Sequence, residues 1–171
     1  YGYPGTYASS SVAIGYGAGY GDLNETFKAY RYQDVIIGQS ALGGAFLPSA
    51  SLTQFNTIVG TEAGYNGTSI KNSTLLGYQA GFNITSGFGN IGLGASSTAN
   101  VTTGHGNISI GNNTYLPSGT ANNQLNIGSI LFGALPATST AFTLPTSGSI
   151  GIGSSSPFSK FAIHTNNGDT A

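Results

Sequence analysis

Charged side chains are scarce in this 171-residue chain. Only 5% of its residues are Asp, Glu, Lys or Arg, against roughly 25% in a typical soluble domain. The formal net charge is −1, from four basic and five acidic side chains, so there is no basic stripe that could neutralise a phosphate backbone. Nucleic acid is therefore not an expected partner. A lone chain with so little charge would have poor colloidal stability.

Cysteine, methionine and tryptophan are absent. Without cysteine there is no disulfide framework and no thiolate metal site, and the lack of all three leaves an oxidant few targets. This composition suits a protein outside the cell. Long apolar runs are missing as well, because none approaches the roughly 18 residues that a membrane-spanning helix needs. Membrane insertion is therefore not expected.

Glycine is abundant, and eight glycines each close a short apolar run. These residues, here called the anchor glycines, are Gly15, Gly38, Gly60, Gly77, Gly94, Gly111, Gly128 and Gly153. The steps between successive anchors are equal from Gly60 to Gly128, and this step is here called the repeat period; the steps before and after are longer. A fixed short period is typical of a solenoid in which each repeat stacks on the last.

The residues three and one before each anchor are apolar or β-branched, and this period of two predicts a strand with one buried face. The expected core is Val12, Ile14, Val35, Ile37, Val59, Leu76, Ile91, Leu93, Ile108, Ile110, Leu125, Ile127, Ile150 and Ile152, with Thr57 and Thr74 completing the pattern. The residue between each pair is polar late in the chain, as at Ser109 and Asn126. In early repeats it is Ile36, Ile58 or Leu75, and we expect another chain to cover these three.

A coil of about 17 residues is too thin to hide both of its faces. Two strands of about five residues, rising about 3.3 Å per residue, give a loop only about 16 Å wide. We therefore expect an all-β protein, a parallel β-solenoid or β-roll completed by self-association into a trimer or a filament.

Three segments are predicted along the chain. Residues 1–11 form an apolar N-terminal arm, residues 12–153 form the repeat domain, and residues 154–171 form a C-terminal strand and tail. An insertion at residues 22–34 holds most of the charge and is expected to be an outward loop. In the C-terminal segment, Phe161 and Ile163 alternate as in an edge strand and are expected to contact a neighbouring subunit.

Several stretches resemble a known family. The runs SVAIGYGAGY from Ser11, NTIVGTEAGY from Asn56 and NSTLLGYQAGF from Asn72 are similar to the head repeats of trimeric autotransporter adhesins. That resemblance implies a left-handed parallel β-roll with three chains bundled together. The ending GSIGIGSSSPFSKFAIH resembles a segment of phage tail-fibre and related surface-fibre repeats. Together these likenesses span residues 11–164 and imply a cell-surface or virion location.

Catalytic and metal-binding patterns are not found. Cleavage of a polysaccharide needs two carboxyl groups about 5 to 9.5 Å apart, whereas most acids here share the insertion with Lys28 and Arg31, where mutual charge pairing is the simpler explanation. The acids are Asp22, Glu25, Asp34, Glu62 and Asp169. His105 and His164 are isolated and lack metal-ligand spacing. We expect no enzyme activity, no cofactor and no metal.

Asparagine occurs repeatedly in N-x-S/T sequons, at Asn24, Asn66, Asn72, Asn83, Asn100, Asn107 and Asn112. Asn66, Asn83 and Asn100 lie six residues after successive anchors, so stacking would place them in a column. The column could carry glycans on a secreted fibre, or its amides could bond from repeat to repeat. We favour the ladder, because adjacent strands lie only about 4.8 Å apart and leave no room for sugars on every site.

Aromatic residues predict a second column. Tyr20, Tyr65 and Phe82 lie five residues after their anchors, and Tyr115 lies one place earlier. Such a column most often packs in a core or at a contact between chains. Exposed rings could instead hold sugars.

The sequence thus predicts a structural subunit of an extracellular, self-assembling fibre. The alternative is a head or fibre segment of a trimeric adhesin, or of a phage receptor-binding fibre, that binds cell-surface carbohydrate. An enzyme that cleaves polysaccharide is a remote third interpretation.

Overall fold

The computed structural model describes residues 6–9, 11–20, 29–44, 52–136, 148–157 and 159–163, which contain strands and turns but no helix. The fold is all-β. Its strands are β1 (Thr6–Ser9), β2 (Val12–Ile14), β3 (Ala29–Tyr32), β4 (Val35–Ile37), β5 (Leu52–Gln54), β6 (Thr57–Val59), β7 (Thr74–Leu76), β8 (Ile91–Leu93), β9 (Ile108–Ile110), β10 (Gln124–Ile127), β11 (Leu131–Ala134), β12 (Ser149–Ile152) and β13 (Phe161–Ile163).

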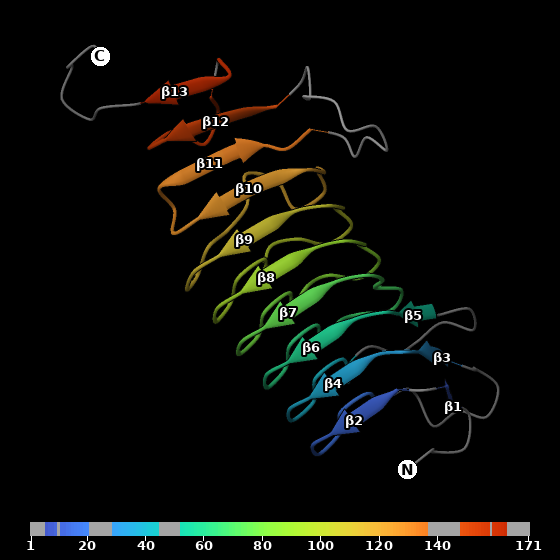
Figure 1. The fold of residues 1–171 in the computed structure, drawn as a ribbon. Helices are drawn as coiled ribbons and strands as arrows, with labels where there is room; N and C mark the ends of the chain where they lie inside the picture. Colours follow the sequence, from blue (N-terminus) through green and yellow to red (C-terminus); the bar gives the residue numbers. More distant parts are fainter. Residues whose placement is uncertain are drawn as a thin grey trace.

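The strands form two sheets. The main sheet has ten strands in the order β13-β12-β11-β10-β9-β8-β7-β6-β4-β2, and the small sheet has the order β1-β3-β5. Figure 1 shows the main sheet as a ladder that begins with β2 and ends with β13. Neighbours from β2 to β10 are parallel, β11 is antiparallel to both of its neighbours, and β13 is again parallel to β12. The sheet is therefore mostly parallel.

The strands pair in the register that the spacing predicts. Ile58 pairs with Leu75, and Leu75 pairs with Gly92, so each partner is one repeat period further along the chain. The turns bond in the same way, since Gly64 N donates to Ala80 O and Gly81 N donates to Ser97 O, at 2.8 Å each. Each repeat therefore lies directly on the next one through its turns as well as its strand.

The anchor glycines occupy a point where two repeats come too close for a side chain. Gly15 and Gly77 have φ values of 129° and 139°, a region that other residues rarely adopt. A Cβ on Gly77 would lie 2.6 Å from the carbonyl oxygen of Gly94 in the next repeat. Gly128 differs, because a Cβ there would meet nothing within 4 Å, and the column of close approaches ends before it.

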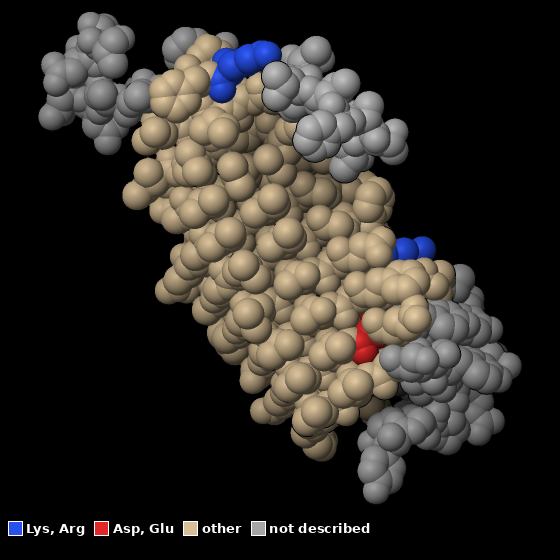
Figure 2. All heavy atoms as spheres, in the orientation of Figure 1, with Lys and Arg blue, Asp and Glu red and all other residues tan. Residues whose placement is uncertain are grey.

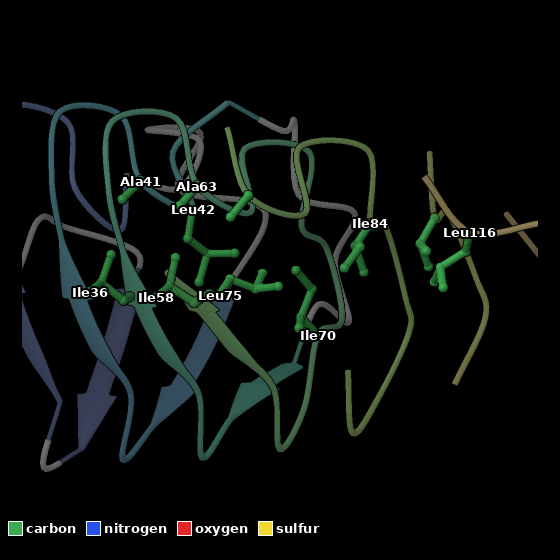
Figure 3. Close-up of a cluster of buried hydrophobic side chains, with 11 residues drawn as sticks. Ile36, Ala41, Leu42, Ile58, Ala63, Ile70, Leu75, Ile84 and Leu116 are labelled. Carbon is green, nitrogen blue, oxygen red and sulfur yellow. The ribbon is translucent and has the colours of Figure 1, made fainter. Parts of the chain in front are cut away.

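The interior is built from the middle residue of each early strand. Ile36, Ile58 and Leu75 are buried and form one cluster with small side chains of the following turn and with aliphatic side chains of the opposite wall (Figure 3). The cluster contains Ile36, Ala41, Leu42, Ile58, Ala63, Ile70, Leu75, Ala80, Ile84, Val101 and Leu116. The prediction that another chain covers Ile36, Ile58 and Leu75 is wrong, because the chain's own repeats cover them.

The predicted core residues lie on the opposite face of the same strands. Leu75 is 0% exposed, whereas the adjacent Leu76 is 48% exposed. Successive side chains of a strand point to opposite faces, so the prediction reversed inside and outside. Of the predicted core set, Leu125 is buried. The others are exposed or half-buried: Val12, Ile14, Val35, Ile37, Val59, Leu76, Ile91, Leu93, Ile108, Ile110, Ile127, Ile150 and Ile152.

Three predicted segments also need correction. Part of the expected arm, Thr6–Ser9, is strand β1 and pairs with β3. Part of the expected outward loop, Ala29–Tyr32, is β3 itself, and the following Asp34 is buried. The final step, from Gly128 to Gly153, is not another repeat of the same kind, because the reversed strand β11 lies between β10 and β12.

The inward and outward positions can be separated with two adjacent leucines. Replacing Leu75 by Ala should lower the free energy of unfolding by about 2–5 kcal/mol, the usual cost of emptying a leucine site in a core. Replacing Leu76 by Ala should cost the dissociated chain less than about 1 kcal/mol. Denaturant titration at low protein concentration measures both. Equal losses, or a larger loss at Leu76, would restore the predicted orientation.

Candidate assembly surfaces

The outer face of the main sheet is the principal candidate. We give this name to the side chains three and one before the anchors on β2, β4 and β6 to β9, which are all aliphatic or threonine: Val12, Ile14, Val35, Ile37, Thr57, Val59, Thr74, Leu76, Ile91, Leu93, Ile108 and Ile110. Figure 2 shows no charged residue over the middle of the stacked strands. Parallel sheets are almost always covered on both faces, but within the described residues the buried cluster lies on the inner side alone.

A column of polar side chains, most of them buried, holds the repeats in register. This polar column occupies the position four before each anchor and consists of Ser11, Asp34, Asn56, Ser73, Asn90, Asn107 and Gln124. Asn56 and Asn90 are almost completely buried. Asn90 Oδ1 accepts a hydrogen bond from Asn107 N at 3.0 Å, and Asn90 Nδ2 donates to Gly104 O at 2.9 Å. Asn56 repeats this pattern, with Ser73 N as donor and Ile70 O as acceptor.

The polar column has a distinct residue near each end. Asp34 is fully buried, and its carboxylate accepts bonds from Thr53 Oγ1 and from both Asn56 N and Asn56 Nδ2, each at 2.9 Å. At the other end, Gln124 Nε2 donates to Ser118 O, and Gln124 Oε1 accepts from Ser118 N, at 2.8 Å each. The longer glutamine side chain thus returns to its own repeat. The column ends here, immediately before the chain reverses into β11.

This column was not among the predicted sites. Its signal was present, because Asn56, Asn90 and Asn107 each stand four residues before an anchor. Positions four and two before the anchor lie on the same face of a strand. A repeated asparagine there marks the inner face, because amides that satisfy main-chain groups are favoured inside a stack.

The sequon asparagines fall into different environments. Asn107 is 0% exposed within the polar column, which agrees with a role between repeats and leaves its side chain no room for a glycan. Asn66 and Asn83 form the predicted ladder, with Asn66 Nδ2 donating to Asn83 Oδ1 at 3.3 Å. Asn83 Nδ2 then donates to Ala99 O, and Asn100 Nδ2 to Leu116 O, at 2.7 Å each. Asn72 and Asn112 are exposed, and Asn24 lies outside the described residues.

The threonines of those three ladder sequons also join repeats. Thr68 Oγ1 donates to Thr85 O at 3.0 Å, and Thr85 Oγ1 donates to Thr102 O at 3.2 Å. Both polar side chains of the N-x-T pattern are therefore engaged in contacts between repeats. These contacts are sufficient to account for the recurrence of the pattern at the repeat period.

The predicted aromatic column is short. The rings of Tyr65 and Phe82 stack with their centroids 5.1 Å apart and 4° between their planes. A side chain on Gly44 would collide with the ring of Tyr65, so the chain's own main chain covers the other side of this ring. Tyr20 is half-buried, and Tyr115 is exposed. The stack is a contact between repeats of one chain.

Phe88 is an exposed aromatic residue in an otherwise polar column. It stands six residues before its anchor, as do Gln54, Lys71, His105 and Asn122 in neighbouring repeats. Phe88 is 50% exposed, and its ring stacks on His105 with the centroids 3.9 Å apart and 17° between the planes. Phe88 N donates to His105 Nδ1 at 3.2 Å. This bond places the proton of the neutral imidazole on Nε2.

The described acidic side chains are engaged within the fold. Asp34 belongs to the polar column, and Glu62 Oε2 accepts a hydrogen bond from Gln79 Nε2 at 2.7 Å. Asp22, Glu25, Asp169 and His164 lie outside the described residues. In the described part of the chain, no group of three His, Cys, Asp or Glu residues could hold a metal ion, and no helix has the length and apolar character to cross a membrane.

The C-terminal strand was expected on a neighbouring subunit. Instead β13 pairs with β12 of the same chain, with Phe161 opposite Ile150 and Ile163 opposite Ile152. The side chain of Phe161 is exposed. One edge of β13 is therefore used within the chain, and the other is the outer edge of the main sheet.

Comparison of the chain with models of protein families, with curated proteins and with solved structures finds no match.

The polar column can be tested at Asn90. Replacing Asn90 by Ala leaves the buried Asn107 N–H and Gly104 C=O without their partners, and each such loss costs about 1–3 kcal/mol. The stability should therefore fall by about 2–5 kcal/mol in a thermal or denaturant melt. Asn90→Ser should cost less, because Ser73 in the same column accepts the same kind of bond, from Asn90 N.

Asn112→Ala is the matched control for this pair, since Asn112 is exposed, and it should change stability by less than about 0.5 kcal/mol. If Asn90→Ala were as stable as this control, the column would not hold the repeats together.

Proposed function

We propose that the protein is a structural subunit of an extracellular self-assembling fibre or surface filament, and that it is not an enzyme. In this proposal the chain forms a short parallel β-solenoid with coils of about 17 residues, and copies of the chain complete it by covering one another. The single observation that carries the proposal is the outer face, a half-exposed aliphatic surface on a parallel sheet. Its location would be outside the cell, on a cell surface or on a virion, without any cofactor.

The chemistry of the outer face favours a second copy as its cover. The face has no charge and no strong hydrogen-bonding group to specify a different partner. Its side chains recur at the strand spacing, about 4.8 Å, so a second copy has the same spacing and can interleave with it. Identical surfaces that match each other are the usual basis of symmetric assembly.

The magnitude of the apolar gain is sufficient for self-association. Covering the exposed half of an aliphatic side chain contributes roughly 1 kcal/mol. The ten aliphatic members of the outer face therefore contribute roughly 10 kcal/mol for each covered chain, and roughly 20 kcal/mol for two copies that cover each other. Association costs about 4–15 kcal/mol. The gain exceeds this cost, which supports other copies as the cover in the proposed homotrimer or filament.

The low charge and the absence of cysteine, methionine and tryptophan also support an extracellular assembly. A surface with few charges is a disadvantage for a free chain but not for a subunit whose faces are covered. Few oxidisable side chains would preserve a protein that is not renewed.

Lateral assembly can be tested at Leu76. Replacing Leu76 by Lys places a charge on the outer face, so sedimentation should show a shift from assemblies to single chains, because a covered charge is strongly disfavoured. The melt of the dissociated chain should be little changed. Phe55→Lys is the matched control, since Phe55 is 54% exposed and lies in the turn between β5 and β6, outside the outer-face set. Unchanged assembly of Leu76→Lys would refute the lateral contact.

A second function is favoured by Phe88. In this alternative the protein is a head or fibre segment that binds cell-surface carbohydrate, as its resemblance to adhesin repeats implies. The exposed part of the Phe88 ring lies between Lys71 and His105 of the neighbouring repeats. It combines an apolar surface with hydrogen-bond donors, as the linings of small-ligand sites do. Paired carboxylates for cleavage of a polysaccharide are not found among the described residues, so binding is favoured over catalysis.

Glycan binding is tested with the variant Phe88→Ala on a glycan array. Removal of the ring should weaken binding to any recognised glycan by about two- to tenfold, since an aromatic stacking contact is worth about 0.5–1.5 kcal/mol. Tyr115→Ala is the control, because Tyr115 is exposed to a similar degree. Equal binding by the two variants, or no binding by the parent chain, would remove this alternative.

A further inference from the structure

The two outer strands of the main sheet run in the same direction. β2 is the last strand at one end of the sheet, and β13 is the last at the other end. From β2 to β10 all pairs are parallel, and the two antiparallel pairs, β10 with β11 and β11 with β12, cancel each other. Since β13 is parallel to β12, it has the direction of β2. Copies placed end to end would therefore bring two parallel edges together (Figure 1).

The two edge strands also have matching sequences. β2 reads Val12-Ala13-Ile14, and β13 reads Phe161-Ala162-Ile163. The register within the sheet places Ala13 opposite the inward Ile36, and Ala162 opposite Gly151, which is buried. Val12 and Phe161 are the exposed first residues of their strands. In the register of the sheet, alanine would stand opposite alanine, with larger apolar residues before and after it on both strands.

The main-chain groups are in the correct phase for this pairing. Val12 N donates to Asp34 O, and Gly38 N donates to Ile14 O, at 2.8 Å each, so the N–H and C=O of Ala13 point to the outer edge. At the other end, Ile150 N donates to Lys160 O at 3.0 Å. The alternation then directs the N–H and C=O of Phe161 and Ile163 to the outer edge of β13.

In a parallel ladder, the N–H and the C=O of one residue bond to the two residues that flank the residue opposite it on the neighbouring strand. Ala13 placed opposite Ala162 fulfils this condition, because Ala13 N would donate to Phe161 O and Ile163 N would donate to Ala13 O. If the two strands were shifted by one residue, the outward N–H and C=O of Ala13 would face residues of β13 whose own N–H and C=O point away. Direction, sequence and hydrogen-bond phase thus agree on one register.

We propose that β13 of one copy pairs in parallel with β2 of the next, with Ala162 opposite Ala13, so that the main sheet continues from subunit to subunit along a polar fibre. The partner is a second copy of this chain. This inference rests on the proposed function, since it specifies the axial contact of the fibre. Neither strand contains a charge or a proline, the residues that commonly protect an edge from such pairing.

The contact is tested by cross-linking, for which the chain has no cysteine of its own. Val12→Cys and Phe161→Cys are prepared separately, mixed, dissociated and reassembled, and then treated with an ethylene-bridged bis-maleimide. Adjacent edges should give covalent dimers that contain one chain of each variant, identified by mass spectrometry. Ile130→Cys replaces Phe161→Cys in the control, because Ile130 is 63% exposed and lies in the turn between β10 and β11. This control should give at least tenfold fewer cross-links.

Two proline variants supply a second measurement. Ala13→Pro removes an N–H that β4 does not use, so it should keep the fold and shorten the fibres seen by electron microscopy, because edge strands tolerate proline only where the N–H is free. Val12→Pro removes the donor to Asp34 O and should instead lower the melting temperature of the single chain.

The outcomes separate the two proposals. Mixed dimers together with short Ala13→Pro fibres support the axial contact. Dimers of Val12→Cys alone or of Phe161→Cys alone would indicate ends that meet in the opposite sense and would overturn it. Fibres that form without either cross-link, or that keep their length with Ala13→Pro, would overturn the axial contact while the proposed function stands. Parent chains that never assemble at any concentration would refute both.

Discussion

Stacking at the strand spacing is the constraint on which the structure depends. Every part of a repeat, turns included, must bond to the equivalent part of the next repeat, as Leu42 N does to Ala63 O and Gly64 N to Ala80 O. A side chain that projects along the stack has no space. The anchor position is therefore glycine, and a Cβ on Gly15 would lie 2.6 Å from Gly38 O. From Gly15 to Gly94 the recurrence of glycine at this position follows from the close approach, which ends before Gly128.

The interior changes character along the stack. The middle strand residue is Ile58 or Leu75 in early repeats but Gly92 and Ser109 later, where Ser109 Oγ lies 2.7 Å from Thr114 Oγ1. Polar columns can occupy a core when every member is satisfied by its neighbours. The described structure leaves one exception, since the buried Ser97 Oγ has no hydrogen-bond partner, and nothing in the structure explains why serine replaces the alanine of earlier repeats there.

The sequence was sufficient to predict the period, the strand positions and the all-β class, because each depends on local chemistry that recurs. It was insufficient to predict which face is inside. In early repeats both faces of each strand are apolar, as at Leu75 and Leu76, and alternation alone cannot choose between them. The deciding information was the polar column, since an asparagine such as Asn90 on the same face as Leu75 can be buried only beside main-chain groups that need it.

The end of the stack was beyond prediction for a different reason. At the reversal into β11 the polar column does not continue to a further repeat, because the Gln124 side chain bonds to Ser118 of its own repeat and to Asn107 of the preceding one. The anchor pattern of SIGIG near Gly153 looks like another repeat, yet it belongs to a strand beyond the reversal. A pattern of three or four residues predicts a strand, but it does not say with which strand it pairs.

The proposed assembly uses both the aliphatic outer face and the matching edges of the main sheet. In the proposed fibre, a stack without its own covering layer can be short and thin, because neighbouring copies would supply the missing layer and the missing strands. Main-chain bonds like those that join repeats within the chain would then join the chains, in the same direction and at the same spacing. A chain of this kind must also end its run of parallel repeats. Here the run ends at β10, where the Gln124 side chain bonds to its own repeat and β11 runs in the opposite direction. A second reversal follows before β12, so β13 again runs in the direction of β2. Without this second reversal, the outer strand would be antiparallel to β2 and could not continue a parallel sheet into the next copy.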